Sequence, residues 1–316
     1  MKIIDTHCDA LLKLQSDKRR SRGFMDEQAP LNFYDAEEID TNYNRLKEGD
    51  LQVQFFAIFI SPKVPDNEKW QHALEQVDAF YNEVLGQENM VHIKNLKEIK
   101  QLKPHEIGAV LTLEGADAFG NDLMKLRTLI RLGVLSVGLV WNNANLVADG
   151  VGETRSAGLS NFGAEVIEVC NENDVLIDVS HLNIPGFNDI TDKADRIFAS
   201  HSNARGIFDH QRNLTDEQIT QIIDRNGMIN IVFCPMFINE GELEIEDLFP
   251  HIDRIINLGG SDNIGIGSDF DGIATYVNGL NHAGEFQNLV NKLQAQYGTE
   301  FTEKMTHRNF KKIFCE

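Results

Sequence analysis

The sequence is poor in basic side chains. Of its 316 residues, 29 are Lys or Arg and 49 are Asp or Glu, which gives a formal net charge of −20 at pH 7. A nucleic-acid-binding protein needs a basic face that displaces counterions from the phosphate backbone. The charge therefore excludes nucleic acid as an expected partner.

Cysteine is scarce, and hydrophobic runs are short. The chain has four scattered cysteines: Cys8, Cys170, Cys234 and Cys315. Because they show no paired spacing, we expect free thiols in a reducing cytoplasm. The most apolar stretch, residues 53–60, has the length of a buried strand, whereas a membrane span needs about 20 apolar residues. The first fifteen residues lack the basic and apolar regions of a secretory signal. These absences predict a cytoplasmic protein that does not enter a membrane.

No Pro/Ser-rich linker, low-complexity tract or internal repeat divides the chain. Length alone suggests two domains, but an α/β barrel commonly takes about 250 residues or more as one domain. We therefore expect residues 1–316 to form a single catalytic domain.

What the chain does contain is an alternation of short apolar segments and longer amphipathic ones. Eight segments are typical of buried strands: 2–5, 51–60, 108–113, 134–140, 175–179, 196–200, 227–232 and 263–268. Helical patterns cover 68–85, 123–132, 164–173, 216–225, 245–257 and 302–314, with Thr215 as the expected N-cap of the fourth. This rhythm predicts an α/β fold, a parallel (β/α)8 TIM-type barrel, with a doubly wound open sheet as the alternative.

Imidazole and carboxylate side chains collect where the predicted strands end. They are His7 and Asp9 after the first strand, Glu114 after the third, His181 after the fifth, His201 after the sixth and Asp269 after the eighth. The carboxyl ends of parallel barrel strands face one rim, so we expect these side chains to converge. His7 and Asp9 are two residues apart in an extended segment and point the same way, so both can reach one ion. Nitrogen and oxygen ligands suit a divalent transition metal, most readily zinc.

Each of these residues alone has a simpler explanation, since a single His at a strand end is more often a hydrogen-bonded core or rim residue than a ligand. The coincidence carries the prediction, because three of the ten histidines fall at three strand ends and the other seven are expected in helices or loops. Five ligands exceed what one tetrahedral ion needs, which indicates two ions bridged by a carboxylate. Asp269 is then left to accept the proton of the attacking water and pass it to the leaving amine.

Seven short motifs bear a resemblance to a known family. They are Ile4-Asp5-Thr6-His7-Cys8-Asp9, Leu113-Glu114-Gly115, Gly158 to Gly163, Ile177-Asp178-Val179-Ser180-His181, Ser200 to Arg205, Arg212 to Asp216, and Gly265 to Gly272. Together, and in consistent order, they resemble the membrane dipeptidase family, also called renal dipeptidase. The resemblance implies an amidohydrolase-like metal-dependent hydrolase that cleaves the peptide bond of dipeptides through a metal-bridging hydroxide.

The resemblance also implies roles for individual residues. His7 and Asp9 would bind one zinc ion, His181 and His201 the other, and Glu114 would bridge the two. Asp269 would be the proton shuttle, and Arg212 matches the family's substrate-facing arginine, whose guanidinium grips a carboxylate or carbonyl oxygen.

Two positions depart from the family pattern. Trp141, followed by Asn142, stands where the best-known members carry a substrate-facing His, so the Trp141 indole N–H or the Asn142 amide is the expected donor to the oxyanion. Core packing is the alternative for Trp141. Cys234 stands where a tyrosine is frequent, so a substrate contact is expected to be missing there.

Three rival interpretations stay open. The string His282-Ala283-Gly284-Glu285 also occurs in adenosine deaminases, but here it follows Asp269, and we expect a loop with Glu285 opening a helix. An N-acyl amino acid deacylase is a second alternative, and many of those enzymes bridge their metals with a carbamylated lysine. The third is a non-catalytic barrel binding protein, which the complete set of competent side chains disfavours. The expected partners are a small dipeptide and, as an open alternative, a second copy of the chain in a homodimer.

Overall fold

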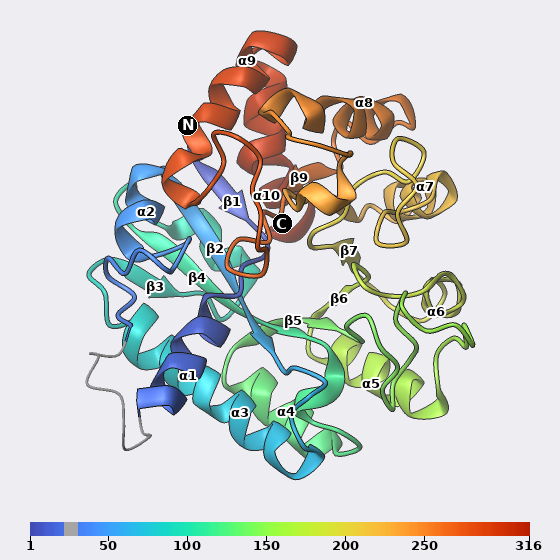
Figure 1. Ribbon diagram of the computed structural model, residues 1–316. Coiled ribbons are helices and arrows are strands. Elements are labelled where there is room, and N and C mark those ends of the chain that lie inside the picture. Colours follow the sequence, from blue (N-terminus) through green and yellow to red (C-terminus); the bar gives the residue numbers. More distant parts are fainter. Residues whose placement is uncertain (22–30) are drawn as a thin grey trace.

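The computed structural model describes residues 1–21 and 31–316, and its strands close into a barrel (Figure 1). Parallel pairing runs in the order β2-β1-β9-β8-β7-β6-β5-β4, and β2 pairs with β4 to close the ring. The bounds are β1 (Ile3–Asp5), β2 (Leu51–Phe59), β4 (Ile107–Glu114), β5 (Val134–Gly138), β6 (Leu176–Asp178), β7 (Ile197–Ala199), β8 (Met228–Ile231) and β9 (Ile264–Ile266). The predicted (β/α)8 barrel and its eight strands are confirmed, and the open-sheet alternative is wrong.

A ninth strand, β3 (Met90–His92), was not predicted. It pairs with residues 107–109 at the start of β4, whereas β5 joins β4 only from Leu111 onward. The expectation that seven histidines lie in helices or loops is therefore wrong for His92. Three residues are too few for a period-2 pattern to show in the sequence. The His92 ring packs against Phe80 and Tyr81, with ring centroids 5.1 and 5.4 Å away.

Helices surround the strands (Figure 1). They are α1 (Ala10–Ser21), α2 (Tyr43–Glu48), α3 (Asp66–Ala79), α4 (Leu123–Arg131), α5 (Asn161–Glu172), α6 (Ile184–Ile190), α7 (Asp216–Asp224), α8 (Phe249–Asn257), α9 (Phe286–Glu303) and α10 (Asn309–Phe314). Thr215 caps α7 as predicted, because its Oγ1 accepts a hydrogen bond from the Gln218 N–H. The helices α1, α2 and α6 were not predicted, whereas α9 begins at Phe286, where a helix was expected. Within the described ranges, no helix has both the length and the apolar character needed to cross a membrane.

Alternate strand side chains face opposite sides of the barrel wall. Ile3, Phe56 and Ile58 belong to the core shared with the helices, whereas the interior of the barrel holds a separate cluster. That cluster joins strand residues such as Ile4, Val53, Phe55, Val110 and Leu176 to Phe310 and Phe314 of α10. The C-terminal helix α10 therefore closes the end of the barrel at which the strands begin.

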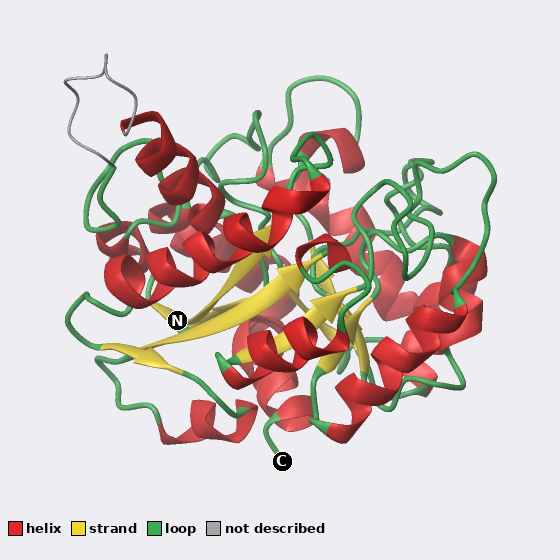
Figure 2. Ribbon diagram, turned by 90° about the horizontal axis from the view of Figure 1, so that it is seen from below, coloured by secondary structure: helices red, strands yellow, loops and turns green. Residues whose placement is uncertain are grey.

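The opposite end of the barrel carries the long loops. In Figure 2 these loops gather above the strands, on the side of the arrowheads, and the C-terminus lies on the other side. One end is thus plugged by apolar packing, while the carboxyl ends of all the strands open onto loops. Polar side chains that follow a strand are positioned at this second end.

Candidate metal centre

The six predicted metal and proton-transfer residues lie together at the loop end of the barrel. His7 and Asp9 follow β1, Glu114 ends β4, His181 follows β6, His201 follows β7 and Asp269 follows β9. His7, Asp9, Glu114, His181 and His201 are all buried. Burying a carboxylate or an imidazole costs free energy unless the group is paired. Five such buried groups in one place therefore require compensating interactions.

Glu114 stands at the centre of the cluster. Potential ligand atoms of Glu114, His181 and His201 lie within 4.8 Å of one another, and so do those of His7, Asp9 and Glu114. The Glu114 carboxylate is thus common to two three-residue groups. A third group of this kind joins His7 and His201 to Asp269. The first two groups contain the residues that the family resemblance assigned to each ion, an assignment that stays a prediction, and the third places Asp269 beside them.

The closest contacts join nitrogen and oxygen atoms that face a common point. His181 Nε2 lies 2.8 Å from Glu114 Oε1 and 3.0 Å from His201 Nε2. Two imidazole nitrogens on one tetrahedral zinc ion, each bonded at 2.0–2.1 Å, are about 3.3 Å apart. His7 Nε2 lies 3.5 Å from Asp9 Oδ2. The spacing of these donors is therefore that of a metal-binding group.

Hydrogen bonds to the outer ring nitrogens support the two histidines. His201 Nδ1 lies 2.7 Å from Ser200 Oγ, and that hydroxyl donates to Asp178 Oδ2 at 2.5 Å. His181 Nδ1 lies 2.9 Å from Asn142 Oδ1. With the proton of each ring on Nδ1, the Nε2 lone pair of each ring faces the cluster.

The electrostatics of the cluster call for a cation. Burial lowers the pKa of His7, but the nearby carboxylates of Asp9, Glu114 and Asp269 outweigh it and raise that pKa to about 10. Burial, together with the charge of Asp9, raises the pKa of Glu114 well above its usual range. In the described part of the chain, the buried atoms His7 Nε2 and Asp9 Oδ1 have no hydrogen-bond partner. A divalent cation would balance the buried carboxylate charge and would also bind the unpaired nitrogen and oxygen atoms, so this donor set fits metal ions.

The pKa values of His181 and His201 are lowered well below the usual range, mainly by burial and further by the positive charges of His7 and Arg212. Both imidazoles are therefore neutral at neutral pH. A metal ion binds the neutral form, so these two rings require no proton release before they coordinate.

Asp269 has an unusual backbone. Its φ of 65° lies in the left-handed region, which aspartate tolerates better than most residues. A Cβ on Gly272 would lie 2.3 Å from Asp9 Oδ2 and 2.6 Å from Asp269 Oδ1, so only glycine permits this approach. Burial raises the pKa of Asp269 to about 7, with the nearby Asp9 carboxylate adding to the effect and His7 and Arg212 opposing it. A carboxyl group with such a pKa can both accept and release a proton near neutral pH.

The loop that carries Asp269 is anchored through Asp271, a residue without a predicted role. Asp271 accepts hydrogen bonds from the Asp40 and Thr41 backbone N–H groups at 2.7 and 3.2 Å, and Lys13 Nζ lies 2.8 Å from it. These partners come from α1 and the segment before α2. No local pattern in the sequence indicates contacts over such separations.

A cavity of about 400 Å³ opens over the cluster. Besides the polar residues, it is lined by Leu12, Phe59, Trp141, Cys234, Met236, Phe237 and Ile273. The Trp141 and Phe59 rings pack against each other with centroids 5.4 Å apart, and Trp141 lies 6.1 Å from the His181 ring. Trp141 is therefore both a packing residue and part of the cavity wall.

Arg212 also lines this cavity, although it is almost fully buried. Its Nη2 donates to the His201 backbone carbonyl at 3.3 Å, and its guanidinium lies over the Phe237 ring at 5.3 Å. Its Nε and Nη1 have no hydrogen-bond partner among the described residues. A buried guanidinium with free donors is suited to bind an anionic group in the cavity.

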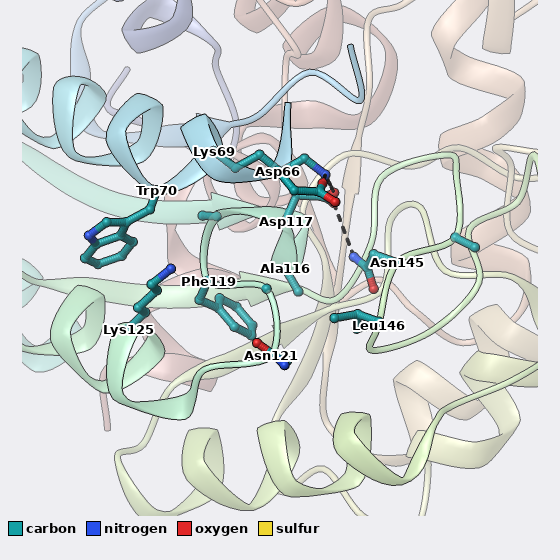
Figure 3. A pocket seen from close by; sticks show the side chains of 13 residues that line it. Asp66, Lys69, Trp70, Ala116, Asp117, Phe119, Asn121, Lys125, Asn145 and Leu146 are labelled. Atoms are coloured by element: carbon teal, nitrogen blue, oxygen red, sulfur yellow. Dashed lines mark hydrogen bonds and ion pairs between the residues drawn. The ribbon is translucent and has the colours of Figure 1, made fainter. Parts of the chain in front are cut away.

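A second cavity, of about 560 Å³, is formed by α3, the start of α4 and the loops after β4 and β5 (Figure 3). Lys69 lies 2.9 Å from both Asp66 and Asp117, and Asn145 donates to Asp117 at 3.3 Å. Asn145 also donates to the Leu139 carbonyl at 2.9 Å. The bond between Asn145 and Asp117 joins the loop that follows Trp141 to the loop that follows Glu114.

Two residues that support the His201 ring, Asp178 and Ser200, were not predicted as functional. Asp178 Oδ1 also accepts hydrogen bonds from the Ser180 and Ser200 backbone N–H groups, at 3.1 and 2.9 Å. Both residues stand inside the motifs named above, Asp178 three residues before His181 and Ser200 directly before His201. Their place in these motifs was the only sign in the sequence of a role at the site.

The string 282–285 behaves as expected, because Ala283–Glu285 forms a single 3-10 turn and α9 begins at Phe286.

A (β/α)8 barrel with buried His, Asp and Glu side chains at its carboxyl-terminal rim defines a metal-dependent hydrolase. Comparison with known proteins specifies which one. The chain belongs to the membrane dipeptidase family, peptidase family M19, whose model matches residues 1–316. The family match favours a metallo-dipeptidase over the deacylase and deaminase alternatives, and the predicted family is confirmed.

Individual relatives agree with this assignment. An uncharacterized dipeptidase of Schizosaccharomyces pombe is 29% identical over 92% of this chain and 74% of its own length. Among solved structures, a metallopeptidase from Rhodobacter sphaeroides has a TM-score of 0.87 at 25% identity, covering 99% of this chain and 98% of the other. A dipeptidase of family M19 has a TM-score of 0.85 at 25% identity, covering 100% and 99%.

Proposed function

We propose that this chain is a zinc dipeptidase with two ions bridged by Glu114. The observation that carries the proposal is the membership of Glu114 in two separate ligand groups. His7 and Asp9 would hold one ion, and His181 and His201 the other. Bound zinc would polarise the scissile carbonyl and lower the pKa of the attacking water. We further propose that residues 1–316 act as one catalytic domain.

The remaining site residues bind substrate and move protons. Asp269 Oδ1 lies 3.7 Å from His7 Nε2, at the edge of the ligand cluster, and would take the proton of the nucleophile and deliver it to the leaving amine. Arg212 would bind the carboxylate of the dipeptide through its free Nε and Nη1 donors. The aromatic and aliphatic cavity wall excludes water from the substrate side chains.

The partner that we propose is a small dipeptide, and the homodimer stays a hypothesis. The Rhodobacter sphaeroides structure is liganded with a phosphinate mimic of L-Ala-D-Ala, which makes L-Ala-D-Ala the first dipeptide to assay. The proposed location is the cytoplasm, supported by four buried free cysteines.

Two measurements test the function. Elemental analysis of protein purified without chelator from zinc-replete cells should give about two zinc ions per chain, since five ligands are too many for one tetrahedral ion. A panel of L,L and L,D dipeptides should identify cleaved substrates. A reproducible metal content near zero would refute the binuclear site, and the absence of cleavage across the panel would refute the dipeptidase.

The Trp141 position yields a separate prediction. Trp141 and Asn142 both line the cavity, so the Trp141 indole N–H and the Asn142 Nδ2 amide are the two candidate donors to the developing oxyanion. Trp141→Phe keeps an aromatic ring against Phe59 and removes the donor, so we expect turnover to fall by about 10² at unchanged zinc content. Steady-state kinetics and metal analysis check this, and near-normal turnover would leave Trp141 with packing alone.

A further inference from the structure

The contact between Asn142 and His181 joins two parts of the chain that the fold brings together. Asn142 lies in the loop after β5, and its Oδ1 is 2.9 Å from His181 Nδ1, 39 residues further along. On the other side of the ring, His181 Nε2 faces Glu114 Oε1 at 2.8 Å and His201 Nε2 at 3.0 Å. The imidazole is therefore held between an amide and the ligand cluster.

Only one arrangement of the ring proton suits metal binding. A neutral imidazole carries a single N–H, so an Nε2 lone pair requires the proton on Nδ1. A buried Nδ1–H needs an acceptor, since an unpaired buried donor costs about 1–3 kcal/mol. Asn142 Oδ1 is that acceptor. Without it, the competing arrangement with Nε2–H donating to Glu114 Oε1 would be favoured, and that tautomer cannot bind a metal through Nε2.

His201 has a different support for the same purpose. Its Nδ1 bonds to Ser200 Oγ, which in turn donates to the Asp178 carboxylate. The His201 ring is thus oriented through a charged group, whereas His181 is oriented by a neutral amide alone. Loss of the amide oxygen should consequently act on His181 and spare His201.

We propose that Asn142 is a positioning residue that holds His181 in the tautomer able to bind metal. The inference rests on the proposed zinc site and gives Asn142 Oδ1 a role beside the substrate-binding role that the sequence suggested for the amide N–H group of this residue. Partners of this kind typically change metal affinity by about 10- to 100-fold. The effect should fall on the ion shared by His181 and His201.

The test is a titration with Zn²⁺ in competition with a colorimetric chelator, applied to metal-free full-length protein. Asn142→Leu keeps the size of the side chain and removes the acceptor, so one of the two zinc dissociation constants should rise about 10- to 100-fold while the other stays near its wild-type value. Asn142→Asp retains an acceptor oxygen and should restore wild-type affinity. The exposed neighbour Asn143 supplies the control, since Asn143→Leu should bind zinc as the wild type does.

The possible outcomes separate this inference from the proposed function. Wild-type zinc affinity in Asn142→Leu overturns the inference, and a raised KM with that unchanged affinity would return Asn142 to substrate binding. If the leucine variant does not fold, Asn142→Ala makes the same comparison. A wild-type protein that binds no zinc refutes the proposed function and the inference together. A wild-type protein that binds zinc, with the same affinity in Asn142→Leu, refutes only the inference.

Discussion

Replacing Glu114 with glutamine is expected to remove both zinc ions together and to lower turnover by about 10³ or more. The carboxylate is common to the two ligand groups, and its Oε1 lies 2.8 Å from His181 Nε2 and 3.9 Å from His7 Nε2. Glutamine keeps the size but removes the charge that bridges two cations. Several kcal/mol of transition-state stabilisation would go with the ions. Zinc per chain and kcat, measured on the same preparation, check this expectation.

Comparison with other variants makes the result specific to the bridging role. A variant of an unshared ligand, such as His181→Ala, should lose one ion and keep more of the other. Glu165→Gln, on the exposed face of α5, should change neither zinc content nor turnover. If Glu114→Gln retains two ions, Glu114 is not the bridge, and if it loses a single ion, Glu114 serves only one of the two sites.

The second large effect is expected at Asp269. Asp269→Asn should reduce turnover by about 10² to 10⁴, the usual contribution of a positioned acid-base group, with zinc content unchanged. Asparagine also tolerates left-handed φ values, so the backbone at 65° should persist. Steady-state turnover with a cleaved dipeptide and elemental analysis measure the two quantities.

Asp174 supplies a control for the positive φ of Asp269. Asp174 has a similar φ of 55° and an exposed side chain paired with Arg196. Asp174→Asn removes only a surface ion pair worth about 1 kcal/mol or less, so turnover should stay at the wild-type level. Because Asp269 also forms a group with His7 and His201, parallel loss of zinc in Asp269→Asn would reassign it as a metal ligand.

The architecture followed from local patterns in the sequence. Buried parallel strands require continuous apolar runs, and eight such runs separated by amphipathic segments determine a barrel. The same rule placed His7, Glu114, His181, His201 and Asp269 at one rim, since each ends a strand or follows one within three residues. The strand β3 and the helices α2 and α6 were not predicted, because three to seven residues carry too little periodicity. The twelve-residue helix α1 was also not predicted.

The structure alone decided how the site side chains are used. The sequence identified Asn142 but suggested a donor for substrate, whereas the fold turns its Oδ1 toward His181. It contained Asp178 and Ser200 without indicating that they form a hydrogen-bonded support for His201. A salt bridge likewise joins Asp271 to Lys13, which lies near the other end of the sequence. The chemical type of a ligand and the end of a strand depend on residues that are close together in the sequence, so the sequence alone determines them. Hydrogen-bond partners 22, 39 or more than 200 residues apart exist only once the barrel has closed.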